Sequence, residues 1–319
     1  MKRANANMNG RNNVRANGWR RTGLLGILIL ACAGCATPTP QFTDEEWVSH
    51  TTTGRGSRAR GDERRAADAF ARAQQRARAL DDADALAVSA VNRAYCLLPL
   101  GRASEARADV AEALSDARVS TARRAELLAA AARVELALNQ PDAALTFCTD
   151  AAALQPPCVL QAQLALSESA AWMTKKDNAA AAKALSALPP KIWAQLPESV
   201  QAEHALRRGE IAEADEKFAD AAVLYDETAA LWKSAGRLPE MARALQAAGR
   251  QYRAAGDTAS ACDRLYRAAQ SFRAQGLAAE AIAALDAGVS CAEVLKDDAT
   301  SRRMAELVVT FQQAERPNE

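Results

Sequence analysis

One spacing recurs six times along this chain and restricts its fold more than any other feature. A turn residue is followed five positions later by alanine, and successive alanines lie 38 to 40 residues apart. The pairs are Gly61 with Ala66, Gly101 with Ala106, Asn139 with Ala144, Asp177 with Ala182, Glu216 with Ala221 and Gly256 with Ala261. A period of this length indicates supersecondary units that bury their apolar faces only by stacking on one another.

Composition tells what each unit is made of. The 319 residues include 79 alanines but only 5 isoleucines, and 5% of the chain is aromatic. Alanine loses no side-chain entropy in a helix, whereas β-branched and aromatic residues are the typical strand formers. We therefore predict an all-α protein and exclude all-β and doubly wound architectures. Turn residues divide the chain after residue 61 into about thirteen helices, with Pro141 and Pro239 in first turns, where a missing N–H costs little.

The apolar positions of these units follow helical spacing. Four residues after most of the alanines stands a larger side chain, and a small residue follows one turn later. The larger residues are Phe70, Val110, Cys148, Tyr225 and Leu265, and the small ones are Ala73, Ala113, Ala151 and Ala268. Small residues let two helices approach closely while the larger residue fills the gap to the next pair. The pattern predicts antiparallel helix pairs that stack into one continuous array.

These motifs resemble the tetratricopeptide repeat. The best copy is 242–275, with Leu245, Gly249, Tyr252, Gly256, Ala261, Leu265 and Ala268 at the family's signature offsets; 202–235 follows. The resemblance implies a right-handed superhelical solenoid of antiparallel helix pairs over 62–315, followed by a tail, 316–319. The units exceed the family's usual 34 residues, so we expect longer second helices and inter-unit loops. Pro189, Pro190 and Pro197 predict a bend in the array.

The first 34 residues have the pattern of a secretion signal. Six basic residues and no acid precede or flank an apolar run from Leu24 to Ala31, which is too short to span a membrane. Residues 30–35 read Leu-Ala-Cys-Ala-Gly-Cys and resemble a bacterial lipoprotein signal. The resemblance implies acylation of Cys35, with Cys32 as the alternative acceptor, and a plain cleaved signal is the other interpretation. Because Ala36 follows Cys35, it also implies the periplasmic face of the outer membrane in a Gram-negative bacterium.

Residues 35–61 are rich in proline, glycine and threonine, and we interpret them as a flexible tether that holds the repeat domain away from the membrane. Helix 62–80 would then be the terminal capping helix, with Arg65, Arg72 and Arg76 on a solvated face. Contact of these arginines with anionic lipid or cell-wall polymer is the alternative.

Charge and residue types argue against several functions. Removing the six basic residues of 1–34 from a chain of net charge +1 leaves −5, which gives no electrostatic basis for nucleic-acid binding. His50 and His204 have no second histidine or cysteine at metal spacing, and we interpret His204 as a surface residue. Cys96, Cys148, Cys158, Cys262 and Cys291 contain no Cys-x-x-Cys, although Cys148–Cys158 or Cys262–Cys291 disulfides stay open. We expect no cofactor, no metal and no catalytic site.

In the family, first helices line the inner face of the superhelix, where extended peptides or partner helices bind. The resemblance places eight residues there: Glu203, Leu206, Glu210 and Glu213 from one unit, and Arg243, Gln246, Arg250 and Arg253 from the next. They form a polar clamp for a partner segment, or alternatively inter-repeat ion pairs of little energy.

The expected function is a membrane-anchored, non-catalytic protein-protein interaction scaffold of the bacterial cell envelope that assists assembly of an outer-membrane or secretion complex. Its partner would be another envelope protein or a peptide segment, and its oligomeric state stays open. The alternative is an envelope enzyme, or a regulator of one, with an acidic site in the groove. A small-molecule binder would need an aromatic-lined cavity, with Trp172, Trp193, Trp232, Tyr225 and Tyr252 as candidates.

Overall fold

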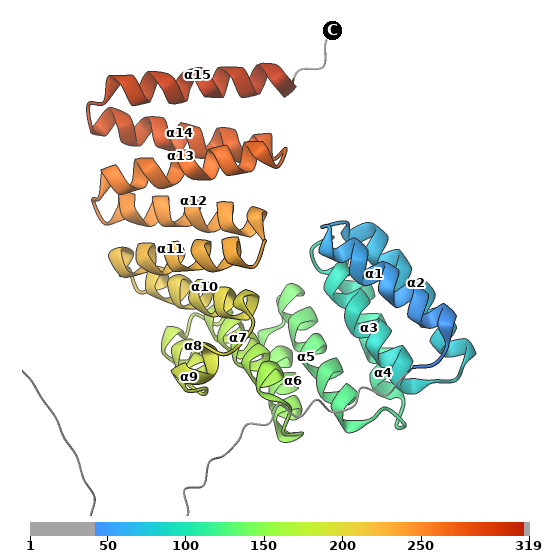
Figure 1. Cartoon of the computed structure of the whole chain (residues 1–319). Helices are drawn as coiled ribbons and strands as arrows, with labels where there is room; N and C mark the ends of the chain where they lie inside the picture. The colour runs from blue at the N-terminus through green and yellow to red at the C-terminus, as the bar shows by residue number, and fades with distance from the viewer. Residues whose placement is uncertain (1–41, 316–319) are drawn as a thin grey trace, which may run out of the picture. The chain divides into compact units, whose positions relative to one another are not determined.

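The computed structural model describes residues 42–315, which contain fifteen α-helices and no β-strands (Figure 1). The helices are α1 (Glu45–Ala59), α2 (Glu63–Ala79), α3 (Ala83–Leu97), α4 (Ala103–Ser115), α5 (Thr121–Ala137), α6 (Pro141–Ala153), α7 (Cys158–Thr174), α8 (Asn178–Leu185), α9 (Pro190–Trp193), α10 (Glu198–Ala214), α11 (Phe218–Ser234), α12 (Leu238–Ala254), α13 (Thr258–Ala274), α14 (Ala278–Val294) and α15 (Asp298–Glu315). The predicted all-α class is confirmed, and so are the thirteen expected helices; α1 and α9 were not expected. None of α1–α15 is long and apolar enough to cross a bilayer.

The tether prediction is wrong for the described part of 35–61. Helix α1 begins after Asp44, whose carboxylate caps it by accepting the Trp47 N–H at 2.8 Å. The Trp47 side chain is buried, and its indole N–H donates to Ser89 Oγ of α3 at 2.9 Å. This tryptophan anchors α1 to the array, so α1, rather than α2, is the terminal helix of the described chain.

The glycines of α1 led to the wrong prediction of a flexible tether, because Gly54 serves close packing of two helices. A Cβ placed on Gly54 would lie 2.7 Å from the ring of Phe70, which is fully buried in α2. Only glycine allows the two helices to approach this closely, and the contact outweighs its poor helix propensity of about 1 kcal/mol. The signal segment 1–34, Cys35 and the tail 316–319 lie outside the described residues.

The repeating turn residues end helices in the left-handed conformation. Gly256 has φ +86°, and the Asp257 N–H behind it donates to Tyr252 O at 2.9 Å, which satisfies a carbonyl left free at the end of α12. Gly61, Gly101, Asn139 and Glu216 also have positive φ, between 58° and 78°. In the fourth pair the register slips by one residue: Lys176 has φ +61°, and Ala181, rather than Ala182, is the buried alanine.

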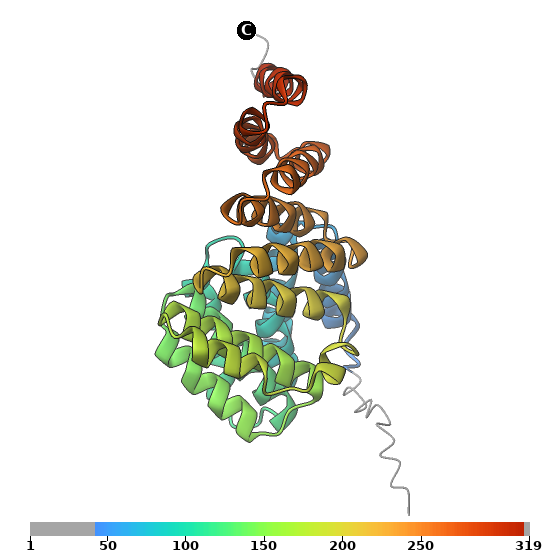
Figure 2. The ribbon, with the colours of Figure 1, turned by 90° about the vertical axis from the view of Figure 1, so that its left-hand side faces the viewer.

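Helices α1–α10 and α10–α15 pack differently. In the first part α3 contacts α5, α5 contacts α7 and α7 contacts α10, in addition to their chain neighbours, and these four helices form an inner layer. In the second part each helix contacts chiefly the preceding and following ones, as Figure 2 shows for the stack that ends in α14 and α15. Helices α10–α15 begin 20 residues apart. Helices α10–α14 are 17 residues long, so both helices of a unit are lengthened, contrary to our expectation for second helices and loops.

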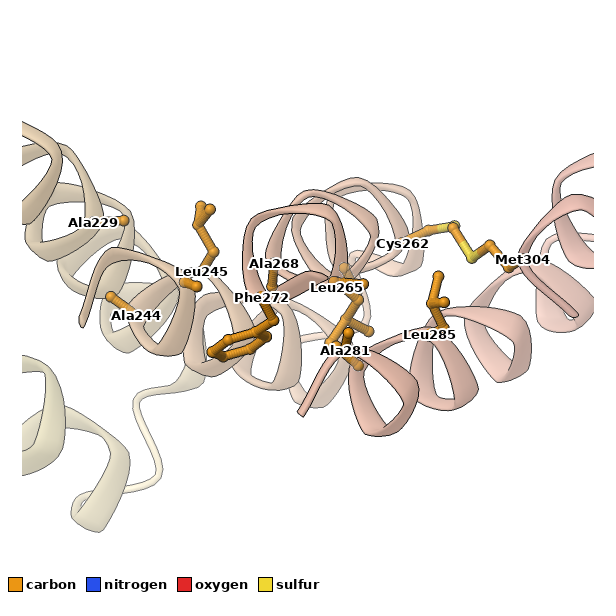
Figure 3. Packing of buried hydrophobic residues seen from close by; sticks show 14 of the residues in the cluster. Ala229, Ala244, Leu245, Cys262, Leu265, Ala268, Phe272, Ala281, Leu285 and Met304 are labelled. Carbon is orange, nitrogen blue, oxygen red and sulfur yellow. The ribbon is translucent and has the colours of Figure 1, made fainter. Parts of the chain in front are cut away.

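A continuous apolar core runs through the C-terminal stack. Leu265 and Phe272 of α13 lie between Leu245 of α12 and Leu285 of α14, with Ala268 where the helices approach closely (Figure 3). Burying a leucine or phenylalanine side chain contributes about 1.5–3 kcal/mol. Each helix covers the apolar face of its predecessor, which is why no hairpin is stable alone.

The array is irregular where the prolines predicted a break. Helix α8 has 8 residues, and after it Pro189 and Pro190 start the single turn α9. Trp193 at the end of α9 is buried, and its indole N–H donates to Leu185 O of α8 at 3.2 Å. This turn therefore occupies part of the place of the missing half of α8.

Candidate functional site

The inner layer of α1–α10 holds the best candidate for a binding surface. A cavity of about 250 Å³ lies between α5, α7 and α10. Its lining consists of Arg133, Leu136, Leu166, Ser167, Ala170, Glu203, Leu206 and Arg207. Charged groups and apolar side chains alternate here, as in surfaces that hold the backbone and the side chains of a partner segment.

Arg133 and Glu203 form the central ion pair of this cavity. Arg133 Nη2 of α5 lies 2.8 Å from Glu203 Oε2 of α10, so the pair joins helices 70 residues apart. Burial lowers the pKa of Arg133, but the charges of Glu203 and Tyr95 and the hydrogen bond to Glu203 together raise it above its ordinary value. The Arg133 side chain is 28% exposed, so a partner can still reach the guanidinium.

Tyr95 of α3 extends this polar row toward the N-terminus. The guanidinium carbons of Arg58 and Arg133 each lie 5.5 Å from the centre of its ring, within cation–π distance. Burial raises the pKa of the Tyr95 phenol, while both arginines act in the opposite direction. Tyr95 therefore contacts one arginine of α1 and one of α5.

The row has a sequence signal that the stronger repeat motif obscures. Residues 58, 95, 133, 170 and 207 follow one another at intervals of 37 or 38, close to the repeat period of this half of the chain. They are therefore equivalent positions in successive inner helices, and three of them, Arg133, Ala170 and Arg207, line the cavity. The family resemblance selected 202–275 instead because those copies match its motif best, so Arg58, Tyr95 and Arg133 were not among the predicted site residues.

The structure divides the eight predicted groove residues between two places. Glu203 and Leu206 line the inner cavity with Arg133. Glu210 pairs with Arg207, and Glu213 accepts the Tyr225 hydroxyl at 2.6 Å. Arg243, Arg250 and Arg253 of α12 are exposed, and Gln246 is half-buried. Whether these residues bind a partner stays a prediction.

The alternative, ion pairs between these two rows, is not seen in the described part of the chain, although Glu203 pairs with Arg133 of another unit. Among the ion pairs of residues 42–315, none joins an acid of α10 to an arginine of α12. The reason is the single-file packing of α10–α15, in which α11 contacts both α10 and α12 along their lengths. The acids of α10 instead find partners in α5, in α11 and within α10 itself.

The alternative function, an enzyme with an acidic site, would need buried carboxyl groups whose pKa is raised. Burial raises the pKa of Asp109 in α4, where Arg93 Nη1 at 2.5 Å acts in the opposite direction. Burial also raises the pKa of Glu210, opposed by Arg207 and reinforced by Glu213. These two carboxyl groups lie on different helices, each facing an arginine. The described residues contain no group of three or more metal-ligating side chains.

The remaining candidate residues have local explanations. The five cysteines of the described residues, Cys96, Cys148, Cys158, Cys262 and Cys291, are free thiols, so neither disulfide that we left open is present in the structure. The interpretation of His204 as a surface residue is wrong, because it is half-buried and its ring stacks on Trp193 at 4.0 Å between centroids. Of the three arginines discussed on α2, Arg76 pairs with Asp44 at 2.6 Å, while Arg65 and Arg72 are exposed.

Comparisons with known proteins agree on the fold. No family model and no curated protein matches this sequence. The apo form of RapI has a similar structure, with a TM-score of 0.61 and 10% identity over 72% of this chain and 67% of RapI. A STAND signal-transduction ATPase with a tetratricopeptide repeat sensor from Pyrococcus horikoshii matches at a TM-score of 0.60 and 14% identity over 86% of this chain. The match spans 48% of that protein. This chain therefore has the fold of a tetratricopeptide-like helical solenoid.

Proposed function

We propose that this protein is a protein-binding scaffold and that the inner layer of α1–α10 holds a segment of a partner protein. The row of Arg58, Tyr95, Arg133 and Glu203 carries the proposal. These side chains come from four helices and contact one another in sequence, and two of them, Arg133 and Glu203, line a cavity of about 250 Å³. Arginine and tyrosine are enriched at the energetic centres of protein interfaces.

The interaction is non-catalytic in this proposal. A scaffold needs fixed donors and acceptors on a rigid surface, and the inner layer supplies them through packed helices instead of loops. The similarity to a protein with a tetratricopeptide repeat sensor is consistent with recognition, although it extends to the fold alone.

Site-specific photocrosslinking tests the inner layer. A photoreactive residue replaces Leu206, which lines the cavity, and a matched variant carries it at Val223 of α11, which is 60% exposed. In native envelopes we expect one discrete crosslinked protein from position 206 and none from position 223. Equal capture from both positions, or capture from neither, would contradict the inner-layer assignment.

We also propose that Cys35 is acylated and holds the scaffold at the periplasmic face of the outer membrane. The support is the signal pattern of 1–35 and the small residues before the cysteine. Each buried methylene of an acyl chain contributes about 0.8 kcal/mol, so several chains give stable anchoring. The anchor would place the inner layer among envelope proteins, and a complex assembled in or below the outer membrane is the expected partner.

Palmitate labelling tests the anchor. Labelling and globomycin-sensitive processing should persist in Cys32→Ser and disappear in Cys35→Ser. The reverse result would move the acyl chains to Cys32, and an unlabelled parent protein would end the lipoprotein proposal while leaving the inner layer to be judged by crosslinking.

A further inference from the structure

The irregular unit at α8 and α9 leaves a second, larger pocket that the scaffold function does not use. Its volume is about 610 Å³, and it lies between α8, α9, α10 and α11. The equivalent helices α4 and α6 have 13 residues, so in a regular unit α8 would continue for at least one more turn. Because α8 stops at Leu185, apolar side chains that a full helix would cover line an open pocket instead.

The pocket has an apolar floor. Leu185, Trp193 and Ile211 line it and are each at least 92% buried, so their positions are fixed by packing on the far side. Trp193 is held further by its hydrogen bond to Leu185 O and by stacking on His204 at an interplanar angle of 11°. A preformed apolar surface of this kind binds ligands without the entropic cost of ordering its own side chains.

The rim carries an available positive charge. Arg208 lines the pocket one helical turn after His204, and its nearest carboxylate, Glu227, is 4.0 Å away. Lys217 and Asp215, also at the rim, pair with each other at 3.0 Å, and Asp215 accepts a further hydrogen bond from Asn178. The charged residues that line the pocket, Arg208, Lys217 and Asp215, sum to one positive charge; Glu227 does not line it.

His204 adds a polar group beside the floor. Burial and the nearby Arg208 lower its pKa to about 4, so the imidazole is neutral at neutral pH. A neutral imidazole presents both a hydrogen-bond donor and an acceptor. It therefore does not add a second positive charge, and Arg208 is the group that selects for an anion.

We infer that this pocket binds a small amphipathic carboxylate of the medium-chain fatty-acid type, with its hydrocarbon chain against Leu185, Trp193 and Ile211 and its carboxylate toward Arg208. The apolar floor fits the chain, and the rim charge fits the head group. Both sites use α10, but they share no lining residue, so each can be tested without altering the other.

Calorimetric titration with decanoate, octanoate and decanol tests the inference. The titrations use the full chain with Cys32→Ser and Cys35→Ser, so that no acyl chain of its own competes. Decanoate should bind at one site, and octanoate about tenfold more weakly, because two methylenes fewer are buried. Arg208→Gln should weaken decanoate about fivefold and leave decanol unchanged. Arg267→Gln, a matched change at an exposed arginine of α13, should alter neither.

A second variant fills the pocket. Ser186 is exposed at the end of α8 and lines the pocket. Ser186→Trp should therefore fill the pocket and abolish binding of both decanoate and decanol, although no floor residue is replaced. Circular dichroism checks that the variant is folded, and Arg208→Gln remains decisive if it is not. Absence of saturable decanoate binding, or equal losses for decanoate and decanol in Arg208→Gln, would overturn the inference. So would a photoreactive residue at 186 that captures a protein segment while decanoate fails to bind.

Discussion

Gly249 gives the sharpest test of how closely the helices of the C-terminal stack approach. It lies in α12 facing α13, where an added Cβ would be 2.7 Å from Leu265 Cγ and 3.2 Å from the backbone oxygen of Ala261. Ordinary contacts of a Cβ are 3.4–4 Å. Leu265 is 1% exposed within the core cluster, so it cannot swing away. Gly249→Ala should therefore push α12 and α13 apart.

The expected cost follows from two opposing effects. Overpacking a filled core costs about 1–3 kcal/mol. Alanine gains about 0.5–1 kcal/mol over glycine inside a helix, which offsets part of this cost. The net change in the free energy of unfolding should be a loss of about 0.5–2 kcal/mol. For a chain of this size, the midpoint of thermal unfolding should fall by a few degrees, at about 2–4 °C per kcal/mol.

Urea unfolding followed by circular dichroism measures this change, and Gly56→Ala is the matched control. A Cβ at Gly56 would meet only the end of the Arg60 side chain at 3.5 Å, so this change should stabilise by about 0.5–1 kcal/mol. Leu265→Ala alone should cost about 2–5 kcal/mol. In that background the clash is relieved, and Gly249→Ala should become neutral or stabilising. If Gly249→Ala stabilises the parent protein as Gly56→Ala does, α12 and α13 lie further apart than these distances require, and close packing is refuted.

Three further predictions test other parts of the molecule. Trp47→Ala should release α1, because it removes the buried indole and its hydrogen bond to Ser89. Hydrogen exchange of residues 45–59 should then accelerate while that of α10–α15 stays the same, and unchanged exchange in α1 would contradict the anchoring role. The pKa of His204 is lowered from 6.5 to about 4, so the folded protein resists its protonation and should lose stability as the pH falls from about 6.5 through 4. Urea midpoints across this range should show a smaller loss in His204→Phe, and identical losses in both proteins would refute the lowered pKa of His204. Arg250→Glu with Arg253→Glu should leave the melting temperature nearly unchanged, because neither arginine has a carboxylate within 4.0 Å among residues 42–315. Lost capture of a partner would then support the polar clamp predicted for these arginines, and lost stability would oppose it.

Sequence alone predicts the helices well because each is delimited by local chemistry. Left-handed residues such as Gly256 and capping residues such as Asp257 act within a few positions, so their signal survives without tertiary information. The one-residue slip at Lys176 shows the limit of such local signals. A lysine rarely adopts a left-handed conformation, and the neighbouring Asp177, which caps α8, was the more conspicuous turn residue.

Helix α1 was missed because its evidence lies in another helix. A glycine such as Gly54 is typical of a linker, and only its contact with Phe70 shows that it serves packing. Likewise, Trp47 anchors α1 through a hydrogen bond to Ser89, which is 42 residues away in the sequence. Composition records that a residue is small or flexible, whereas packing determines whether that property is used. His204 is a similar case, because its burial depends on Trp193 of the irregular turn α9.

The two candidate sites arise from opposite properties of one repeat. The inner cavity depends on regularity, because equivalent positions such as Arg133 and Arg207 come together only where successive inner helices touch. That contact ends at α10. Beyond it each helix contacts chiefly the preceding and following ones, so Arg243, Arg250 and Arg253 of α12 are not part of an inner layer. The second pocket depends on irregularity, because it exists where α8 is too short to cover its neighbours. A regular solenoid would have only the first, so restoring a full-length α8 should remove the carboxylate site while leaving the partner-binding surface intact.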